Sequence, residues 1–190
     1  MKILFISLGC DKNLADSEEM LGLLTGSGHE IVDSEEEAEA IVINTCCFIH
    51  DAKEESVNTI LEMAEYKKTG KCKALVVTGC MAQRYKEEIT QEIPEVDAVL
   101  GTTSYGDIVK ALNEVQAGHV FQEFRDINEL PEDSGRRVLT TGGHFGYLKI
   151  AEGCDKHCTY CIIPSLRGSF RSVPEERLLA QAEYMASQGV

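Results

Sequence analysis

Short runs of aliphatic and β-branched residues alternate with longer polar stretches through the first part of the chain. Five such runs predict strands, at 2–7, 30–33, 40–44, 74–78 and 96–100. These short runs are typical of strands buried in a parallel sheet. The run at 30–33 is the weakest of the five, and we expect it at a sheet edge.

Between these runs, apolar residues recur three and four positions apart, which is the spacing of an amphipathic helix. This spacing predicts helices over 51–68 and 105–116. Asp16 and Ser17 are residue types that cap helices, and they precede the apolar residues of a further helix. Alternating strands and helices predict an α/β fold with a Rossmann-like parallel sheet.

The pattern changes after residue 120 and then resumes in a second unit. We expect a first domain over 1–120, a linker over 121–138 that contains proline, glycine and acidic residues, and a second domain over 139–190. The second domain should begin with a strand at 145–151, continue through a cysteine-rich loop and end in a helix at 174–187. One strand, loop and helix cannot bury their own apolar faces, so we expect this domain to be truncated.

Composition narrows the class of protein. Of the 190 residues, 43% are hydrophobic and 26% are charged, which is ordinary for a folded domain. The net charge of −14 disfavours nucleic acid as a partner and favours a basic protein. No apolar run approaches the length that crosses a bilayer, so we expect a cytoplasmic protein with no membrane partner. In that reducing compartment, the eight cysteines are expected to be metal ligands or buried thiols.

Three cysteines lie in one short loop, at Cys154, Cys158 and Cys161. Structural zinc sites use four protein ligands, whereas three leave a coordination position open. Three thiolates on a four-iron cluster would likewise leave one iron free to bind another ligand. The alternative is a zinc knuckle with His157 as fourth ligand, although tetrahedral coordination by His157 and the adjacent Cys158 would be awkward.

Three further cysteines follow predicted strands, at Cys10, Cys46 and Cys80. Ligands of open parallel sheets gather beyond the carboxyl ends of the strands, so we expect these thiols to converge on a second cluster. Cys47 should point away from Cys46, and Cys72 precedes its strand. We therefore expect both of these thiols to be structural.

The two cysteine sets and their flanking residues resemble the radical S-adenosylmethionine (SAM) methylthiotransferase family. The loop from Cys154 to Cys161, with the Ile162–Gly168 segment after it, resembles the opening of that family's TIM-like radical SAM barrel. The segments around Cys10, Cys46 and Cys80 resemble its amino-terminal cluster-binding domain. Residues 9–13, Gly-Cys-Asp-Lys-Asn, resemble the RimO type, which modifies an aspartate of ribosomal protein twelve of the small subunit.

This resemblance implies an enzyme with two 4Fe–4S clusters, SAM, and an electron donor of the flavodoxin or ferredoxin type. The cluster on Cys154, Cys158 and Cys161 would bind SAM, and the other cluster would carry the sulfur. Tyr160 is a candidate to line the SAM site, with plain packing as its alternative. Arg167 is a candidate to bind a carboxylate or the substrate, and a salt bridge within the loop is equally plausible.

Two alternative functions remain open, and the chain differs from the family in one respect. A tRNA adenosine methylthiotransferase of the MiaB type would share the chemistry, and a zinc or iron–sulfur module would share the cysteines without being an enzyme. Members of the family continue through the rest of the barrel and a small β-barrel module. This chain contains neither, so we expect that the fragment alone can be inactive.

Overall fold

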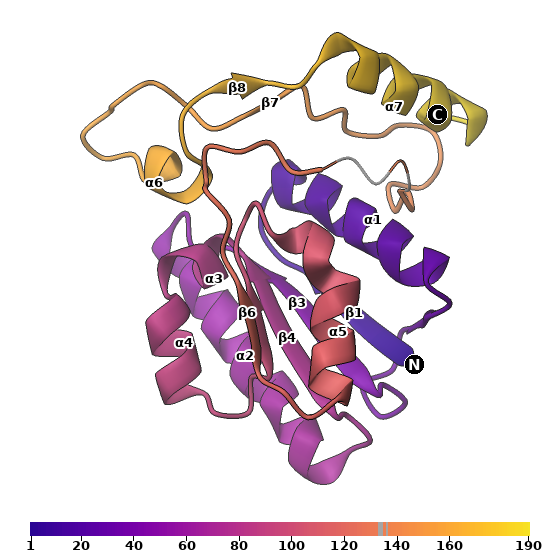
Figure 1. Ribbon diagram of the computed structural model, residues 1–190, viewed down its shortest axis with the longest axis vertical. Coiled ribbons are helices and arrows are strands. Elements are labelled where there is room, and N and C mark those ends of the chain that lie inside the picture. The colour runs from indigo at the N-terminus through magenta and orange to yellow at the C-terminus, as the bar shows by residue number, and fades with distance from the viewer. Residues whose placement is uncertain (133–134, 136) are drawn as a thin grey trace.

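A six-stranded parallel sheet forms the centre of the molecule (Figure 1). The computed structural model describes residues 1–132, 135 and 137–190. The sheet has the order β2-β1-β3-β4-β5-β6. Its strands are β1 (Lys2–Ser7), β2 (Glu30–Val32), β3 (Ala40–Thr45), β4 (Ala74–Gly79), β5 (Ala98–Leu100) and β6 (Phe121–Glu123). The strand order reverses at β1, so the next strand in the chain after β2 pairs on the other side of β1.

Helices cover both faces of this sheet. One face carries α1 (Asp11–Gly26), the short helix η1 (Tyr105–Asp107) and α5 (Ile108–Gln116), and the other carries α2 (His50–Thr69), α3 (Cys80–Arg84) and α4 (Lys86–Glu92). Every residue of β3 and β4 is buried. A strand buried on both faces needs an unbroken apolar run, which explains why these two were clear in the sequence.

The segment after β6 lies across one end of the sheet, where Figure 1 shows it as an orange-to-yellow ribbon. It contains β7 (Ala151–Glu152), α6 (Ile163–Arg167), β8 (Arg171–Ser172) and α7 (Glu175–Ser187), and β7 pairs with β8 in an antiparallel manner. Lys12 Nζ donates a 2.6 Å hydrogen bond to the Ala151 carbonyl, and Thr102 Oγ1 donates one of 2.9 Å to the Leu166 carbonyl. The segment therefore touches the carboxyl-end side of the sheet through both α1 and the loop after β5.

The α/β architecture and the edge position of β2 are confirmed. The strand expected at 145–151 is wrong, because only Ala151 and Glu152 form a strand. A strand requires a neighbouring backbone, and within the described residues this segment pairs only with β8. Phe121–Glu123, expected in the linker, instead adds the sixth strand to the sheet.

The expected cap at Asp16 and Ser17 is also wrong, because α1 begins at Asp11 and both residues lie inside it. Their side chains are buried and bind other parts of the molecule, so tertiary contacts explain their polarity. Residues 133, 134 and 136 of the expected linker lie outside the described residues, and the domain boundaries stay predictions. No helix in the described part of the chain has the length and apolarity needed to span a bilayer.

Candidate functional site

Cys10, Cys46 and Cys80 line a single cleft at the carboxyl ends of the central strands. Cys10 comes after β1, Cys46 directly after β3 and Cys80 directly after β4, and these three strands are neighbours. The cleft has a volume of about 1060 Å³. It lies beside the reversal of strand order at β1, the place where open α/β sheets bind ligands. The expected convergence of the three strand ends on one cleft is present.

Glycines next to two of these cysteines allow the close approach of the backbone. Gly9 has φ +96°, and a Cβ atom there would lie 2.7 Å from Cys46 Cβ and 2.9 Å from Cys46 Sγ. Gly79 has φ +93°, and a Cβ atom there would lie 2.5 Å from the Thr45 carbonyl oxygen. Only glycine accommodates both the backbone conformation and the contact.

Two of the three thiols sit at the start of helices. Cys10 is the N-cap residue of α1, and Cys80 is the first residue of α3. The positive end of a helix dipole favours a thiolate, which is the form that binds metal. Burial raises the pKa of the Cys80 thiol, and the nearby Arg167 guanidinium opposes that rise.

Cys47 and Cys72 behave as structural thiols. Both are buried in the core on the α2 side of the sheet and neither lines the cleft. Cys47 Sγ donates a 3.3 Å hydrogen bond to the Cys80 carbonyl, and burial raises the pKa of Cys47 to about 11. Burial also raises the pKa of Cys72. Their position outside the cleft agrees with the sequence-based expectation that both thiols are structural.

The second cysteine set lies in the irregular loop between β7 and α6. Cys158 is exposed, and Cys154 and Cys161 are partly exposed. The Cys154 amide donates a 3.0 Å hydrogen bond to the Gly168 carbonyl, and the Cys161 amide donates one of 3.0 Å to the Cys158 carbonyl. The first bond ties the start of the loop to the residue after α6, and the second is a turn within the loop.

The spacing of the thiols decides which kind of metal group the first cysteine set can hold. Among the described residues, no three His, Cys, Asp or Glu side chains lie close enough together to bind a single ion. An iron–sulfur cluster is larger than one ion, so its three ligands stand farther apart, and thiolates are its usual ligands. The size of the cleft and the all-thiol donor set fit a cluster at Cys10, Cys46 and Cys80.

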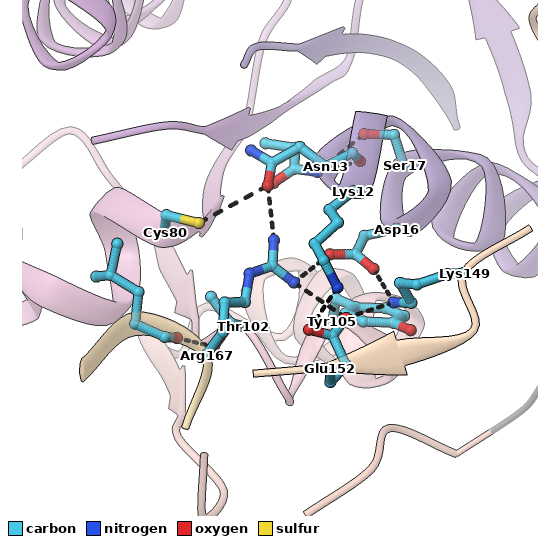
Figure 2. Close-up of polar contacts among 12 residues, drawn as sticks. Lys12, Asn13, Asp16, Ser17, Cys80, Thr102, Tyr105, Lys149, Glu152 and Arg167 are labelled. Atoms are coloured by element: carbon cyan, nitrogen blue, oxygen red, sulfur yellow. Dashed lines mark hydrogen bonds and ion pairs between the residues drawn. The ribbon is translucent and has the colours of Figure 1, made fainter. Parts of the chain in front are cut away.

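A buried network of charges, shown in Figure 2, joins α1 to the C-terminal segment. Arg167 is only 4% exposed, and its Nη1 lies 2.7 Å from Asp16 Oδ2. Lys149 Nζ pairs with the other Asp16 oxygen and lies 3.0 Å from Glu152 Oε1. The geometry therefore matches the salt-bridge alternative for Arg167, with a partner on α1 and not within its own loop.

The network sets the ionisation of its members. Burial by itself lowers the pKa of Lys149, but the carboxylates of Asp16 and Glu152 outweigh burial and hold that pKa well above its ordinary value. Burial raises the pKa of Glu152, but Lys149, Arg167 and Lys12 outweigh it and lower that pKa to about 2. With the pKa of Lys149 and of Arg167 raised and that of Glu152 lowered, these three groups are charged near neutral pH. The two segments are therefore held together by compensated buried ions.

Sequence reasoning missed Asn13, Asp16, Lys149 and Glu152 as members of this site. Asp16 was interpreted as a helix cap, Asn13 entered only as the last residue of the 9–13 segment, and Lys149 and Glu152 carried no motif. A further signal for the first two was position: Asn13 and Asp16 follow Cys10 by three and six residues, so both face the same side of α1. Tyr160, by contrast, was singled out and is 90% exposed in the second loop.

A family model matches residues 2–101, which is more than half of the chain, and its description is "Uncharacterized protein family UPF0004". The chain belongs to the UPF0004 family. The matched residues of this UPF0004 chain contain Cys10, Cys46 and Cys80, and exclude the loop with the second cysteine set. Family membership therefore bears on the first set of thiols alone.

The UPF0004 chain is also similar to curated proteins named "Ribosomal protein uS12 methylthiotransferase RimO". The one from Lachnoclostridium phytofermentans is 63% identical over 190 residues, which cover 100% of this chain and 43% of that protein. Those from Clostridioides difficile and Symbiobacterium thermophilum are each 48% identical over 190 residues and are covered to 43% and 39%. The resemblance to the RimO type is confirmed. The UPF0004 chain spans about two fifths of the length of these relatives.

Proposed function

We propose that this chain is the cluster-binding part of a radical SAM methylthiotransferase that modifies ribosomal protein uS12. The observation that carries this proposal is the shared cleft: Cys10, Cys46 and Cys80 line it together with Ile163 and Arg167, which lie just beyond the second cysteine set. A cleft lined by the first thiol set and by Gly153 and Ile163, which flank the loop of the second set, fits a reaction in which a group passes from one site to the other. A zinc module would not need such a cleft.

The substrate is assigned from the relatives and supported by charge. The relatives whose match covers all of this chain have names that include uS12. The net charge of −14 favours a basic protein over the phosphates of tRNA, because phosphate recognition requires neutralising Lys and Arg. Modification of tRNA is the competing outcome of the substrate test below.

In this proposal, Cys154, Cys158 and Cys161 hold the cluster that binds SAM, and Cys10, Cys46 and Cys80 hold the second cluster. When bound, these groups and SAM supply the radical that removes a hydrogen from an unactivated carbon and the sulfur that replaces it. An electron donor of the flavodoxin or ferredoxin type belongs to the same proposal. Solvent-facing thiols in the second loop leave room for SAM beside their cluster.

The protein's own residues shape the cleft for this chemistry. Leu8, Phe48 and Ile49 give its wall apolar surface, which excludes water from a reactive intermediate. Phe48 and Ile49 are each 56% exposed, so an apolar part of a substrate can pack on them. Gly9 brings the backbone against Cys46, so the first cluster can sit close to the strand ends.

Anaerobic reconstitution of the chain with iron and sulfide tests the two-cluster assignment. We expect about eight irons per chain, since each set of three thiols holds one four-iron cluster. Replacing Cys10, Cys46 and Cys80 together with Ala should remove about half of this iron, and replacing Cys47 and Cys72 with Ala is the matched control that should remove none. Zinc with no iron in the wild-type chain would overturn the proposal.

The substrate is tested with the whole protein that contains this chain. Reduced enzyme and SAM are incubated separately with purified uS12 and with unmodified tRNA, and both products are examined by mass spectrometry. We expect a methylthio group on uS12 alone. Modification of tRNA alone would overturn the substrate assignment and leave the cluster assignment intact.

A further inference from the structure

Asn13 contacts the ends of all three strands that lead to the first cysteine set. Its Nδ2 donates 2.9 Å hydrogen bonds to the carbonyls of Leu8, beside Gly9 and Cys10, and of Thr45, which precedes Cys46. Its Oδ1 accepts a 3.7 Å hydrogen bond from Cys80 Sγ. The Asn13 side chain is fully buried. One amide group therefore connects the three positions at which the thiols stand.

Arg167, at the end of α6, also binds the side-chain amide of Asn13, as Figure 2 shows. Its Nη2 donates a 2.6 Å hydrogen bond to Asn13 Oδ1, and its Nη1 donates one of 2.7 Å to Asp16 Oδ2. The planar guanidinium thus uses its two ends for two partners on successive turns of α1. Such forked binding fixes the orientation of an arginine as well as its position.

The backbone on either side of Arg167 is also fixed. The Leu166 carbonyl accepts a 2.9 Å hydrogen bond from Thr102, and the Leu166 side chain is buried in the core. The Gly168 carbonyl accepts a 3.0 Å hydrogen bond from the amide of Cys154, the first thiol of the second set. A short chain of contacts therefore runs from Cys154 through Gly168 and Arg167 to Asn13.

We propose that Arg167 and Asn13 form a positioning pair that fixes the second cysteine set relative to the first. The role of this pair in catalysis rests on the proposed function, because a transfer between two sites depends on the distance between them. Arg167 then acts through Asn13 and the loop backbone, and it does not bind SAM or the substrate. Its two terminal nitrogens are already directed at Asn13 and Asp16, and the residue is only 4% exposed.

Replacing Arg167 with Lys separates positioning from simple charge balance. Lysine keeps the positive charge beside Asp16 and Glu152, but a single ammonium lacks the fork that also reaches Asn13. The fold should therefore persist while the link to Asn13 is lost. Arg125→Lys is the matched control, because Arg125 pairs with Asp107 at 2.8 Å outside this network.

Amide hydrogen exchange of the cluster-free chain is the first measurement. In Arg167→Lys we expect exchange at Cys154 and Leu8 to quicken roughly tenfold or more, while the centres of β3 and β4 keep their rates. Arg125→Lys should leave the Cys154 and Leu8 rates unchanged. Equal rates in Arg167→Lys and wild type would overturn the positioning pair.

The magnetic interaction between the two reduced clusters is the second measurement, made on the reconstituted chain by electron paramagnetic resonance. Arg167→Lys should retain the iron content of the wild type and weaken or broaden this interaction, which a purely structural role would leave unchanged. Should Arg167→Lys fail to fold, Asn13→Ser keeps the Arg167–Asp16 pair and should give the same two changes. A wild-type chain without iron would refute the proposed function, and the exchange experiment would still decide the pair.

Discussion

Cys10, Cys46 and Cys80 follow three neighbouring strands of one sheet, whereas Cys154, Cys158 and Cys161 share a single loop. In the first set, the buried residues Cys46 and Cys80 directly follow two strands that pair in the sheet, whereas in the second set Cys158 is exposed and the other two cysteines are partly exposed. The first site is thus prepared by the fold before any ligand arrives. The second loop has no regular secondary structure, so the order of its thiols depends more strongly on the metal they bind.

The ion pairs of Asp16 connect α1, which follows Cys10, to the segment that carries the second cysteine set. Asp16→Leu removes the carboxylate that pairs with both Arg167 and Lys149, and it leaves two buried cations without that partner. Breaking a buried pair in this way should lower the free energy of unfolding by about 3–5 kcal/mol. Urea denaturation followed by circular dichroism measures the change.

The exposed pair of Lys2 and Glu37 provides the control for Asp16. Glu37→Gln should leave the urea midpoint unchanged, because solvent screens an ion pair at the surface. An Asp16→Leu chain as stable as Glu37→Gln would show that the C-terminal segment is not held by this network.

Gly9 tests how strictly the first region is preformed. Gly9→Ala places a methyl group 2.7 Å from Cys46 Cβ at φ +96° and should cost about 1–3 kcal/mol of unfolding free energy. It should also reduce the iron held by the first cysteine set, because Cys46 must move. Iron content after reconstitution and urea denaturation measure both effects.

Gly118→Ala is the control for Gly9→Ala, because it adds backbone strain without a steric clash. Gly118 has φ +86° with no atom within 4 Å of its added Cβ, so Gly118→Ala introduces strain alone. It should destabilise the chain less than Gly9→Ala and leave the iron content unchanged. Equal iron content in the two variants would contradict a preformed first site.

Sequence alone predicted the sheet and the three strand ends that line the cleft, because both depend on buried, regular structure. The apolar runs of β3 and β4 marked strands, and parallel topology then placed Cys46 and Cys80 at one edge. The start of α1 was misplaced because Asp16 and Ser17 resemble capping residues in sequence. Their buried partners, Arg167 and Asn44, lie 151 and 27 residues away.

The second region was harder to predict from sequence because its structure depends on contacts with distant segments. The cysteine spacing identified the loop and its three thiols, but it did not indicate where the loop docks. The run at 145–151 resembled a strand, yet strand formation depends on a pairing partner that local sequence does not contain. Arg167 was noticed, and its partners on α1 were not.

Cysteine substitutions in the cluster-free chain compare the two regions directly. Cys80 is buried, so Cys80→Ala should lower the free energy of unfolding by about 1 kcal/mol through the small cavity it leaves. Cys158 is exposed, so Cys158→Ala should change it by less than about 0.5 kcal/mol. Urea denaturation under reducing, metal-free conditions distinguishes them, and equal costs would contradict the difference in preorganisation.

Tyr160 should give the smallest effect on stability and a selective effect on the second region. Its ring is 90% exposed, so Tyr160→Ala should change the free energy of unfolding by less than about 0.5 kcal/mol. If the ring lines the adenine of SAM, its loss should weaken SAM binding to the reconstituted chain about tenfold, as expected for one aromatic stacking contact. Tyr160→Phe keeps the ring and should bind SAM like the wild type. Isothermal titration calorimetry under anaerobic conditions compares the three proteins, and unchanged affinity in Tyr160→Ala would remove Tyr160 from the SAM site. Because the first cysteine set lies on the sheet and not in this loop, its iron content should be the same in all three.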